Sequence, residues 1–294
     1  LGTDGKGTKI FNIPKQLITD YPFDNNYLDS GTSKVHSVLK DNAGNLWIAI
    51  YQKGVMMIPA QPNSFKYIGY KSINKNIIGS NCITSLCRDH EGILWIGTDN
   101  DGIYGITTEL KQRVHYAPHD SPSSVPSTVF GLYEDSERNL WFGSYTNGLG
   151  RLDKKTGQCS YLQNLTDKNG NRIQRVYDLV EDQDKRLWIA TMGAGLFYYD
   201  LKTGQSVYDP KFNAATEKYK WISCLLYAGD NHLYVGTYDG IRCIDLSTDD
   251  FKTEEILSRH IIHSLYEDPQ GNIWIGSSDG LAEWNPQTLS LIHI

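Results

Sequence analysis

The side chains best suited to bind a ligand lie in short segments between predicted strands. Three of these segments begin with tyrosine, at Tyr51, Tyr145 and Tyr238. Aromatic rings stack on the apolar C–H faces of sugars, whereas amide, ammonium and guanidinium groups hydrogen-bond to hydroxyls and carboxylates. The candidate ligand-binding residues are Tyr51, Lys53, Tyr145, Asn147, Arg172, Arg175, Trp221, Tyr238 and His260. For any single loop tyrosine the alternative is simple packing at the rim.

Motifs for other chemistry are weak, and we predict no catalytic residue, no cofactor and no metal. The sequence has no G-x-S-x-G, no H-E-x-x-H and no P-loop. Residues 99–102 and 167–171 resemble the start of calcium loops. A turn is favoured for both, because Leu110 holds the twelfth position of the first and Asp178 of the second lies on a predicted strand. The five cysteines form no CxxC pair and are interpreted as small buried hydrophobes.

A repeated phrase defines the elements that must position these residues. It consists of an acidic residue, a tight turn, Leu-Trp-Ile-Gly-Thr, and then Gly-Leu or Gly-Ile. Five copies pair an Asp with a Trp, and a sixth has Ala228 and Tyr234 in their places. The structural anchors are Asp41 and Trp47, Asp89 and Trp95, Asp135 and Trp141, Asp182 and Trp188, Tyr234, and Asp268 and Trp274. The anchors are 48, 46, 47, 46 and 40 residues apart, a period typical of repeat architectures.

One repeat contains four short β-rich runs, for example 83–89, 94–98, 102–106 and 113–117, split by Gly, Asn and Asp. The first run of each repeat is apolar on both faces, as in a sheet pressed between two neighbours. We therefore predict an all-β, seven-bladed β-propeller with six complete four-stranded blades and a partial first blade. The expected blades of this single domain are 1–34 (partial), 35–80, 81–127, 128–173, 174–219, 220–259 and 260–294.

The repeated residues have structural interpretations. The Asp is expected to accept backbone hydrogen bonds in the turn, and the Trp to be buried between blades. Glycine three residues after the Asp supplies a positive φ at Gly44, Gly92 and Gly271. Arg138 and Lys185 replace it in two copies, so we expect those turns to differ. Gly or Ala two residues after the Trp is expected to leave room for packing.

Composition excludes several classes of function. The net charge is −6 and no Lys/Arg block stands out, which argues against a nucleic-acid partner. No apolar run is long enough to cross a membrane as a helix. The chain starts inside a repeat, at Leu1-Gly2-Thr3, without an initiator Met. We therefore expect a piece of a longer protein.

The phrase Ile83 to Thr98, matched by residues 262–280, resembles the two-component regulator propeller repeat. This resemblance implies the periplasmic sensor region of a hybrid two-component system, in which propellers and a small β-sandwich precede a transmembrane helix and a histidine kinase. It implies a non-catalytic module that binds an oligosaccharide released from a target polysaccharide and helps to control transcription of glycan-utilisation genes. The implied partners are that oligosaccharide, the remaining sensor domains and a second copy in a homodimer.

Two other functions remain open. One is a propeller-type polysaccharide hydrolase or lyase, which requires acidic, His or Tyr groups converging at one face. The other is a structural propeller that only dimerises. In each case the second-to-third strand loops and the segments between blades are expected to share one face.

Overall fold

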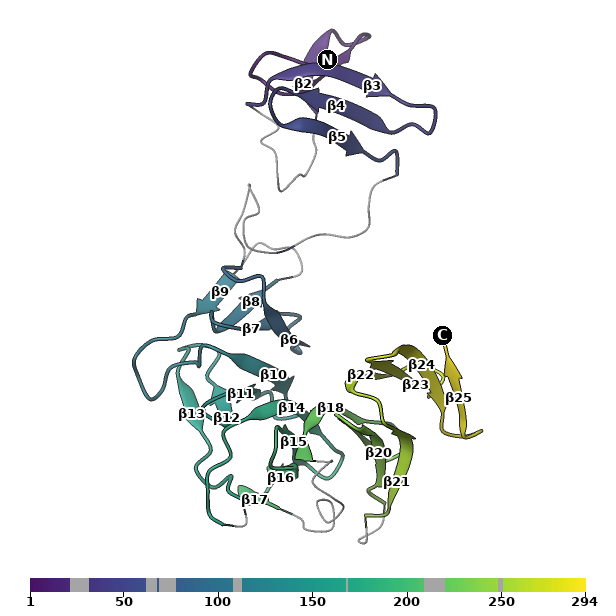
Figure 1. The fold of residues 1–294 in the computed structure, drawn as a ribbon. Helices are drawn as coiled ribbons and strands as arrows, with labels where there is room; N and C mark the ends of the chain where they lie inside the picture. Colours follow the sequence, from purple (N-terminus) through teal and green to yellow (C-terminus); the bar gives the residue numbers. More distant parts are fainter. Residues whose placement is uncertain are drawn as a thin grey trace. The chain divides into compact units, whose positions relative to one another are not determined.

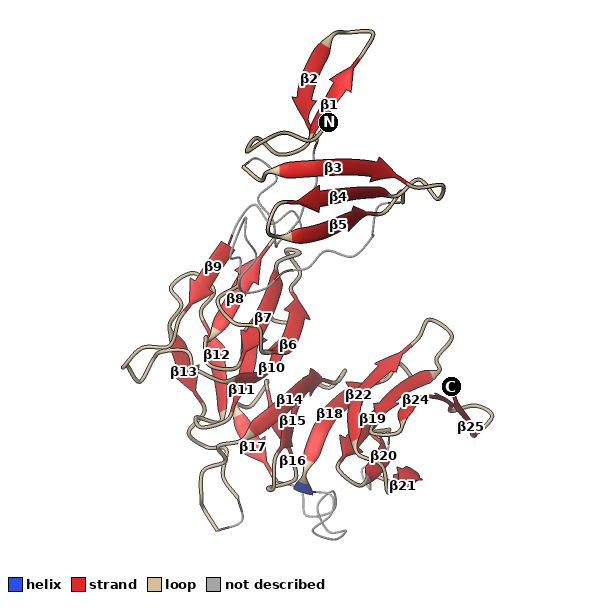
Figure 2. Ribbon diagram, turned by 45° about the horizontal axis from the view of Figure 1, so that its top comes forward, coloured by secondary structure: helices blue, strands red, loops and turns tan. Residues whose placement is uncertain are grey.

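The computed structural model describes residues 1–21, 32–61, 68, 78–107, 113–167, 169–208, 220–247 and 251–294. They divide into two compact units, Leu1–Asn81 and Cys82–Ile294. Antiparallel β-sheet accounts for the regular structure (Figure 1), and strands dominate the ribbon in Figure 2. Within the described ranges, no helix has the length and hydropathy needed to cross a membrane.

The first unit contains two sheets. Strands β1 (Lys9–Asn12) and β2 (Leu17–Asp20) form a hairpin. Strands β3 (Val35–Lys40), β4 (Leu46–Ile50) and β5 (Gly54–Ile58) form a three-stranded sheet around buried Ile48. The blade predicted for residues 35–80 has a fourth strand, but after β5 residues 62–67 and 69–77 lie outside the described residues.

The second unit contains five four-stranded sheets, each ordered as in the sequence. The first two are β6 (Ile83–Arg88), β7 (Leu94–Thr98), β8 (Ile103–Ile106), β9 (Arg113–Tyr116) and β10 (Val129–Glu134), β11 (Leu140–Ser144), β12 (Leu149–Leu152), β13 (Cys159–Tyr161). The third is β14 (Val176–Glu181), β15 (Arg186–Thr191), β16 (Leu196–Asp200), β17 (Gln205–Val207). The last two are β18 (Ile222–Tyr227), β19 (His232–Thr237), β20 (Gly240–Asp245), β21 (Thr253–Ser258) and β22 (Ile262–Glu267), β23 (Ile273–Ser277), β24 (Gly280–Asn285), β25 (Ser290–His293).

Seven antiparallel sheets therefore follow one another along the chain, as the repeat count predicts. In the second unit the first strands of successive sheets are neighbours: β6 contacts β10, β10 contacts β14, β14 contacts β18, and β18 contacts β22. Figure 1 shows these five strands on the inner side of the unit, with the later strands of each sheet farther out. This arrangement confirms the prediction of propeller blades.

Each Asp of the repeat phrase closes its own turn. The Oδ1 atom of Asp89 accepts hydrogen bonds from the N–H groups of Glu91 and Ile93, at 3.0 and 2.9 Å. Its Oδ2 atom accepts the indole N–H of Trp95 at 2.8 Å, a bond that the sequence analysis did not foresee. The same Asp–Trp bond joins Asp41 to Trp47, Asp135 to Trp141, Asp182 to Trp188, and Asp268 to Trp274.

The expectation that Arg138 and Lys185 make different turns is wrong. Their φ angles are 69° and 68°, close to the 83° of Gly92. The turn hydrogen bonds are also kept, because Arg138 N–H donates to the Asp135 carbonyl at 2.8 Å, as Gly92 N–H does to Asp89 at 2.9 Å. A left-handed conformation costs a non-glycine residue about 1–2 kcal/mol. The hydrogen bonds to the Asp are enough to hold it.

The hydrophobic core lies between successive blades. Trp188, with none of its surface exposed, packs against Ile222, Leu225 and Leu233 of the following blade. Trp95, Trp141 and Tyr234 are also buried between blades, which confirms their predicted role. Trp47 is 40% exposed and Trp274 is half-buried. Trp47 belongs to the last sheet in the described part of the first unit, and Trp274 to the last sheet of the second, so no described sheet of the same unit follows either of them.

Glutamate side chains hydrogen-bond to neighbouring blades at the end where the Asp turns lie. Each is the last residue of a first strand and accepts a backbone N–H from the turn of the preceding blade. The pairs are Glu134 with His90 at 2.7 Å, Glu181 with Ser136 at 2.6 Å, and Glu267 with Gly229 at 3.2 Å. A charge-assisted bond of this kind is about twice as strong as a neutral one. The blades are thus held together by polar contacts as well as by the core.

No disulfide bond joins any of the five cysteines. Cys159 and Cys224 are buried, and burial raises the pKa of each thiol to about 12, in keeping with their interpretation as small hydrophobes. Cys82, in contrast, is exposed.

Candidate functional site

Every first strand of the six repeats carries a β-bulge at the same place. In β14, Val176 pairs with Thr191 and Asp178 with Ala190, so Tyr177 is the extra residue. A bulge bends its strand and redirects a side chain, and bulges are common beside functional sites. The bulged residues are His36, Thr84, Phe130, Tyr177, Ser223 and His263.

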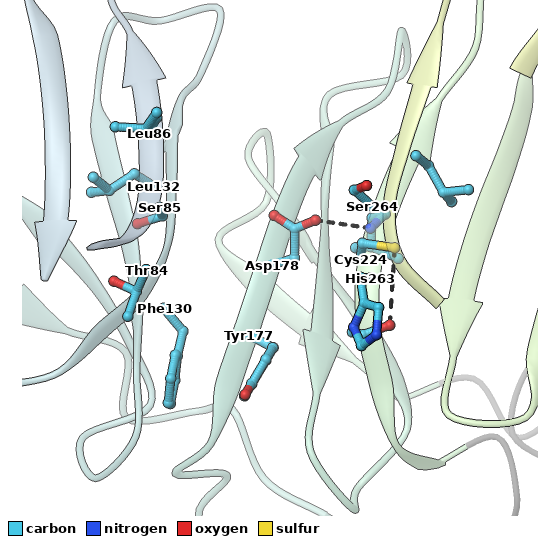
Figure 3. A pocket seen from close by; sticks show the side chains of 13 residues that line it. Thr84, Ser85, Leu86, Phe130, Leu132, Tyr177, Asp178, Cys224, His263 and Ser264 are labelled. Atoms are coloured by element: carbon cyan, nitrogen blue, oxygen red, sulfur yellow. Dashed lines mark hydrogen bonds between the residues drawn. The ribbon is translucent and has the colours of Figure 1, made fainter. Parts of the chain in front are cut away.

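The bulged residues of the second unit line a cavity of about 330 Å³ between the first strands of its five blades. Thr84 and Ser223 use their hydroxyls to hold the next blade, donating to the carbonyls of Val129 and Ile262. Phe130 and Tyr177 stack on each other, with ring centroids 4.4 Å apart. Figure 3 shows these two rings at the same level of the first strands as His263, with Asp178 farther along the strands.

Asp178 is the acidic member of a ring of otherwise small residues that follow the bulges. Its Oδ1 atom accepts the N–H of Leu179 at 2.9 Å, and its Oδ2 atom accepts the N–H of Leu225 in the next blade at 2.8 Å. Burial raises the pKa of this carboxyl to about 6, although the two backbone hydrogen bonds act in the opposite direction. Both oxygens are therefore occupied, and Oδ2 joins β14 to β18.

Raising the pH from about 4 to about 6 is expected to remove stability through Asp178. An unfolded Asp titrates near 3.8 and the folded carboxyl near 6, so the folded state binds the proton more tightly within this window. The contribution is fully present below pH 3.8 and is lost as the pH rises through 6. Urea unfolding at several pH values should show it in the chain but not in Asp178→Ser, which carries the residue of the equivalent positions 37, 85 and 264. An identical pH dependence of the two proteins contradicts the assignment.

An arc of aromatic rings crosses the three central blades of the second unit. Phe130 contacts Tyr145 edge-on at 5.9 Å between centroids, and stacks on Tyr177. Burial, together with the nearby hydroxyl of Tyr238, raises the pKa of Tyr177. Tyr238 in turn stacks on Trp221, at 6.0 Å and 30° between ring planes. We call these five residues the aromatic arc.

The arc is open to solvent at both ends. Tyr145 is 41% exposed, Tyr238 43% and Trp221 41%. These three large rings are held in place by their neighbours, so little side-chain entropy remains to be lost when a ligand binds.

Two arginines flank the loop that carries Tyr145. The guanidinium of Arg175 lies over the Tyr145 ring, 5.0 Å from its centroid, in a cation–π contact. Arg172 donates from Nη2 to the backbone carbonyl of Asn147 at 3.0 Å. One end of the arc is therefore aromatic and the other is cationic.

Backbone hydrogen bonds explain why these segments meet. In five of the blades the residue after the second strand donates its N–H to the residue before the first strand, as Tyr238 does to Trp221 at 3.1 Å and Met192 to Arg175 at 3.1 Å. Within each sheet the second-to-third strand loop and the start of the blade therefore share one edge, as predicted. The Tyr145 loop is closed further by the Ser144 hydroxyl, which donates to the carbonyl of Gly148 at 3.1 Å.

The remaining candidates lie elsewhere. Tyr51 and Lys53 belong to the first unit, where Tyr51 stacks on His36 at 5.1 Å and lines a separate cavity of about 500 Å³. His260 is in the last blade, hydrogen-bonded to Asp279, and makes no ring contact with the arc. Of the nine predicted residues, the structure brings together Tyr145, Asn147, Arg172, Arg175, Trp221 and Tyr238.

The two segments that resemble calcium loops are turns with committed carboxylates. Asp99 accepts the hydroxyl of Thr128 at 2.7 Å, and Asp101 accepts that of Tyr104 at 2.5 Å. Asp167 accepts the N–H groups of Asn169 and Asn171, in the same pattern as the repeat turns. Among the described residues, no three His, Cys, Asp or Glu side chains are placed to hold a metal ion.

Phe130 and Tyr177, which connect the two ends of the arc, are not among the residues predicted from the sequence. A usable signal exists, because the second position of the first strand varies widely among the repeats, whereas the position before it is always Val or Ile. The six residues there are the bulged ones named above. A position whose residue type varies within a repeated strand indicates a side chain that does not have to pack between blades.

The family described as two component regulator propeller matches the chain at residues 77–100, 123–146, 166–193 and 256–279. Each match contains one Asp turn and its Trp. No curated protein sequence matches the chain.

Solved structures confirm the β-propeller fold. The extracellular domain of a hybrid two component system from B. thetaiotaomicron is 21% identical, with a TM-score of 0.73 over 99% of this chain and 38% of that chain. The extracellular domain of a one component system from the same organism is also 21% identical, with a TM-score of 0.65 over 99% of this chain and 41% of that chain. This chain thus spans about two fifths of the length of either. A streptogramin B lyase is 16% identical, with a TM-score of 0.52 over 95% of this chain and 86% of that chain.

Proposed function

We propose that this chain, which is built from two-component regulator propeller repeats, is a non-catalytic sensor module that binds an oligosaccharide on the aromatic arc. The observation that carries the proposal is the exposed, pre-positioned ring set of Tyr145, Tyr238 and Trp221 beside two arginines. Aromatic faces next to hydrogen-bonding side chains are the chemistry that holds a sugar. The likeness to extracellular domains of two component systems supports a periplasmic location.

In this proposal a sugar ring stacks on Trp221, and Tyr238 braces the indole from its other face. Tyr145 offers a second surface at the far side of the arc, so the ligand is an oligosaccharide rather than a single sugar. Asn147 and Arg172 lie at that end to hydrogen-bond hydroxyl groups. The parent protein is proposed to be an inner-membrane histidine kinase, a homodimer whose other sensor domains pass the signal on to the transcription of glycan-utilisation genes.

Enzymatic cleavage is less well supported, although a lyase shares the fold. The one carboxylate among the residues that line the cavity, Asp178, has both oxygens occupied by backbone N–H groups. A general acid or base must reach the proton that it transfers. Asp178 therefore fits a structural role better than a catalytic one.

A panel of oligosaccharides is expected to contain at least one that raises the melting temperature of the chain. A ligand at 100 times its Kd stabilises the folded state by about 2.7 kcal/mol. Trp221→Ala should weaken that ligand by about 30-fold, since a stacked Trp at the centre of a contact contributes roughly 2 kcal/mol. Binding is measured by calorimetry and melting by fluorescence.

Tyr266→Ala is the matched control, because this exposed aromatic lies at the opposite end of β22 from the bulged residue His263. It should leave the affinity unchanged. A complete panel without any stabilising oligosaccharide contradicts the proposal. Release of shortened product from a labelled polysaccharide would instead establish an enzyme.

A further inference from the structure

Arg175 carries a charge that this part of the molecule leaves uncompensated. Among the described residues, no carboxylate lies within ion-pair distance of its guanidinium, which lies over the ring of Tyr145. Arg186 shows the contrast: it also lies over aromatic rings, those of Trp188 and Tyr198, but pairs with Asp182 at 2.6 Å and Asp184 at 3.0 Å. A stacked arginine of the core is neutralised, whereas the one at the arc is exposed and open to a partner.

Arg172 reinforces this positive end. Its one hydrogen bond to the Asn147 carbonyl fixes the side chain and leaves further N–H donors for a ligand. The acidic residue closest in sequence, Asp167, is committed to its own turn, with Oδ1 bound to two backbone N–H groups and Oδ2 to the Asn171 amide. The two arginines thus bracket the Tyr145 loop with two positive charges.

We infer that the oligosaccharide bound at the arc is acidic and contains a uronic acid, whose carboxylate is held by Arg175. This inference rests on the proposed function and specifies its ligand class. A guanidinium presents a planar fork of donors that fits a carboxylate with two parallel hydrogen bonds. The Tyr145 ring holds the guanidinium in place, so less conformational freedom is lost when the carboxylate arrives. A neighbouring sugar of the same chain then stacks on Trp221.

The test uses matched oligosaccharide pairs. Uronate oligosaccharides, for example tetragalacturonate, are compared by calorimetry with their carboxyl-reduced neutral counterparts, and sulfated neutral oligosaccharides form a third arm. We expect binding of a uronate oligosaccharide and at least 10-fold weaker binding of its reduced counterpart. Added NaCl should weaken the uronate complex, because salt screens exposed charges.

Arg175→Gln is expected to weaken the uronate complex by about 10- to 100-fold, the range for a lost charge-assisted bond. Arg175→Lys should recover only part of the affinity, because an ammonium cannot form the paired bonds. Arg151→Gln is the control: Arg151 lies over the ring of Trp141 at 6.0 Å, in the middle of the β12 ladder and outside the arc, and its loss should change nothing. Unchanged melting temperatures establish that the variants fold.

The outcomes separate this inference from the proposed function. Equal binding of the reduced and acidic forms, lost in Trp221→Ala but kept in Arg175→Gln, overturns the acidic ligand and leaves the sugar-binding module intact. If only the sulfated oligosaccharides bind, the inference that the ligand contains a uronic acid is wrong. If no arm binds, both proposals fail together.

Discussion

Trp188→Ala is expected to destabilise the second unit by about 3–5 kcal/mol, the usual range for removing a fully buried large aromatic side chain. The indole fills the space between the blade of β14–β17 and the blade of β18–β21, where Leu225 and Leu233 lie against it. Its N–H also donates to Asp182 Oδ2 at 2.7 Å, and the substitution leaves that buried acceptor with one partner fewer. Urea unfolding followed by fluorescence measures the loss.

Trp274→Ala is the natural comparison. It removes the same side chain and the same bond to Asp268, at 3.0 Å, but from a half-buried position in the last blade. We expect a clearly smaller loss, about 1–2 kcal/mol, because less apolar surface is returned to water. Equal losses at the two sites would mean that burial between blades is not what gives the tryptophan its effect.

The repeat with Tyr234 and Ala228 shows why the sequence could predict the blades. Both partners of the Asp–Trp bond change together, so neither a buried indole N–H nor a buried carboxylate is left without its partner. Tyr234 still packs in the core, where burial and the adjacent Cys243 raise the pKa of its hydroxyl. The apolar pattern and the period sufficed to predict the sheets, because burial of one large ring per blade is a property of residue type and spacing alone.

Backbone conformation was harder to predict than burial. Arg138 and Lys185 suggested altered turns, yet both adopt the positive φ of the glycine that they replace. The hydrogen bonds to the Asp carboxylate stabilise this positive φ. The conformational preference of a single residue type does not include that contribution. The bulge in each first strand likewise cannot be predicted from the alternation of side chains between the two faces of a strand. One extra residue shifts the register locally, and both flanking residues stay in the sheet.

The site was predictable only in part for the same reason. Tyr145, Tyr238 and Trp221 stand in loops that a sequence marks as exposed, and the repeat places those loops at one edge. Phe130 and Tyr177 lie on strands and were not among the predicted site residues, although the bulge turns them into the cavity. Tyr51 occupies the same place in its repeat, but it belongs to the other compact unit.

Gly143→Val is expected to destabilise the second unit by at least about 3 kcal/mol, at the upper end of the range for overpacking a core. A Cβ at this position would lie 2.5 Å from the carbonyl oxygen of Val176 and 2.7 Å from its Cγ1 atom. The first of these contacts is with backbone, so no side-chain rotation relieves it. The blades of β10–β13 and β14–β17 would have to move apart, and the contacts that Trp141 makes across this gap would be lost.

The neighbouring gap supports this interpretation and supplies the control. Gly143 pairs with Gly131, and the first strands there approach so closely that a Cβ on Gly131 would lie 2.9 Å from the Tyr177 carbonyl. One blade further, Ala190 pairs with Asp178, whose carboxylate reaches across the gap to Leu225. Gly229→Ala, whose Cβ would meet nothing closer than 3.8 Å, should change the free energy of unfolding by less than about 1 kcal/mol. A Gly143→Val protein as stable as Gly229→Ala would show that the spacing between blades is not set by these glycines, and that the inner strands can separate without loss of the core.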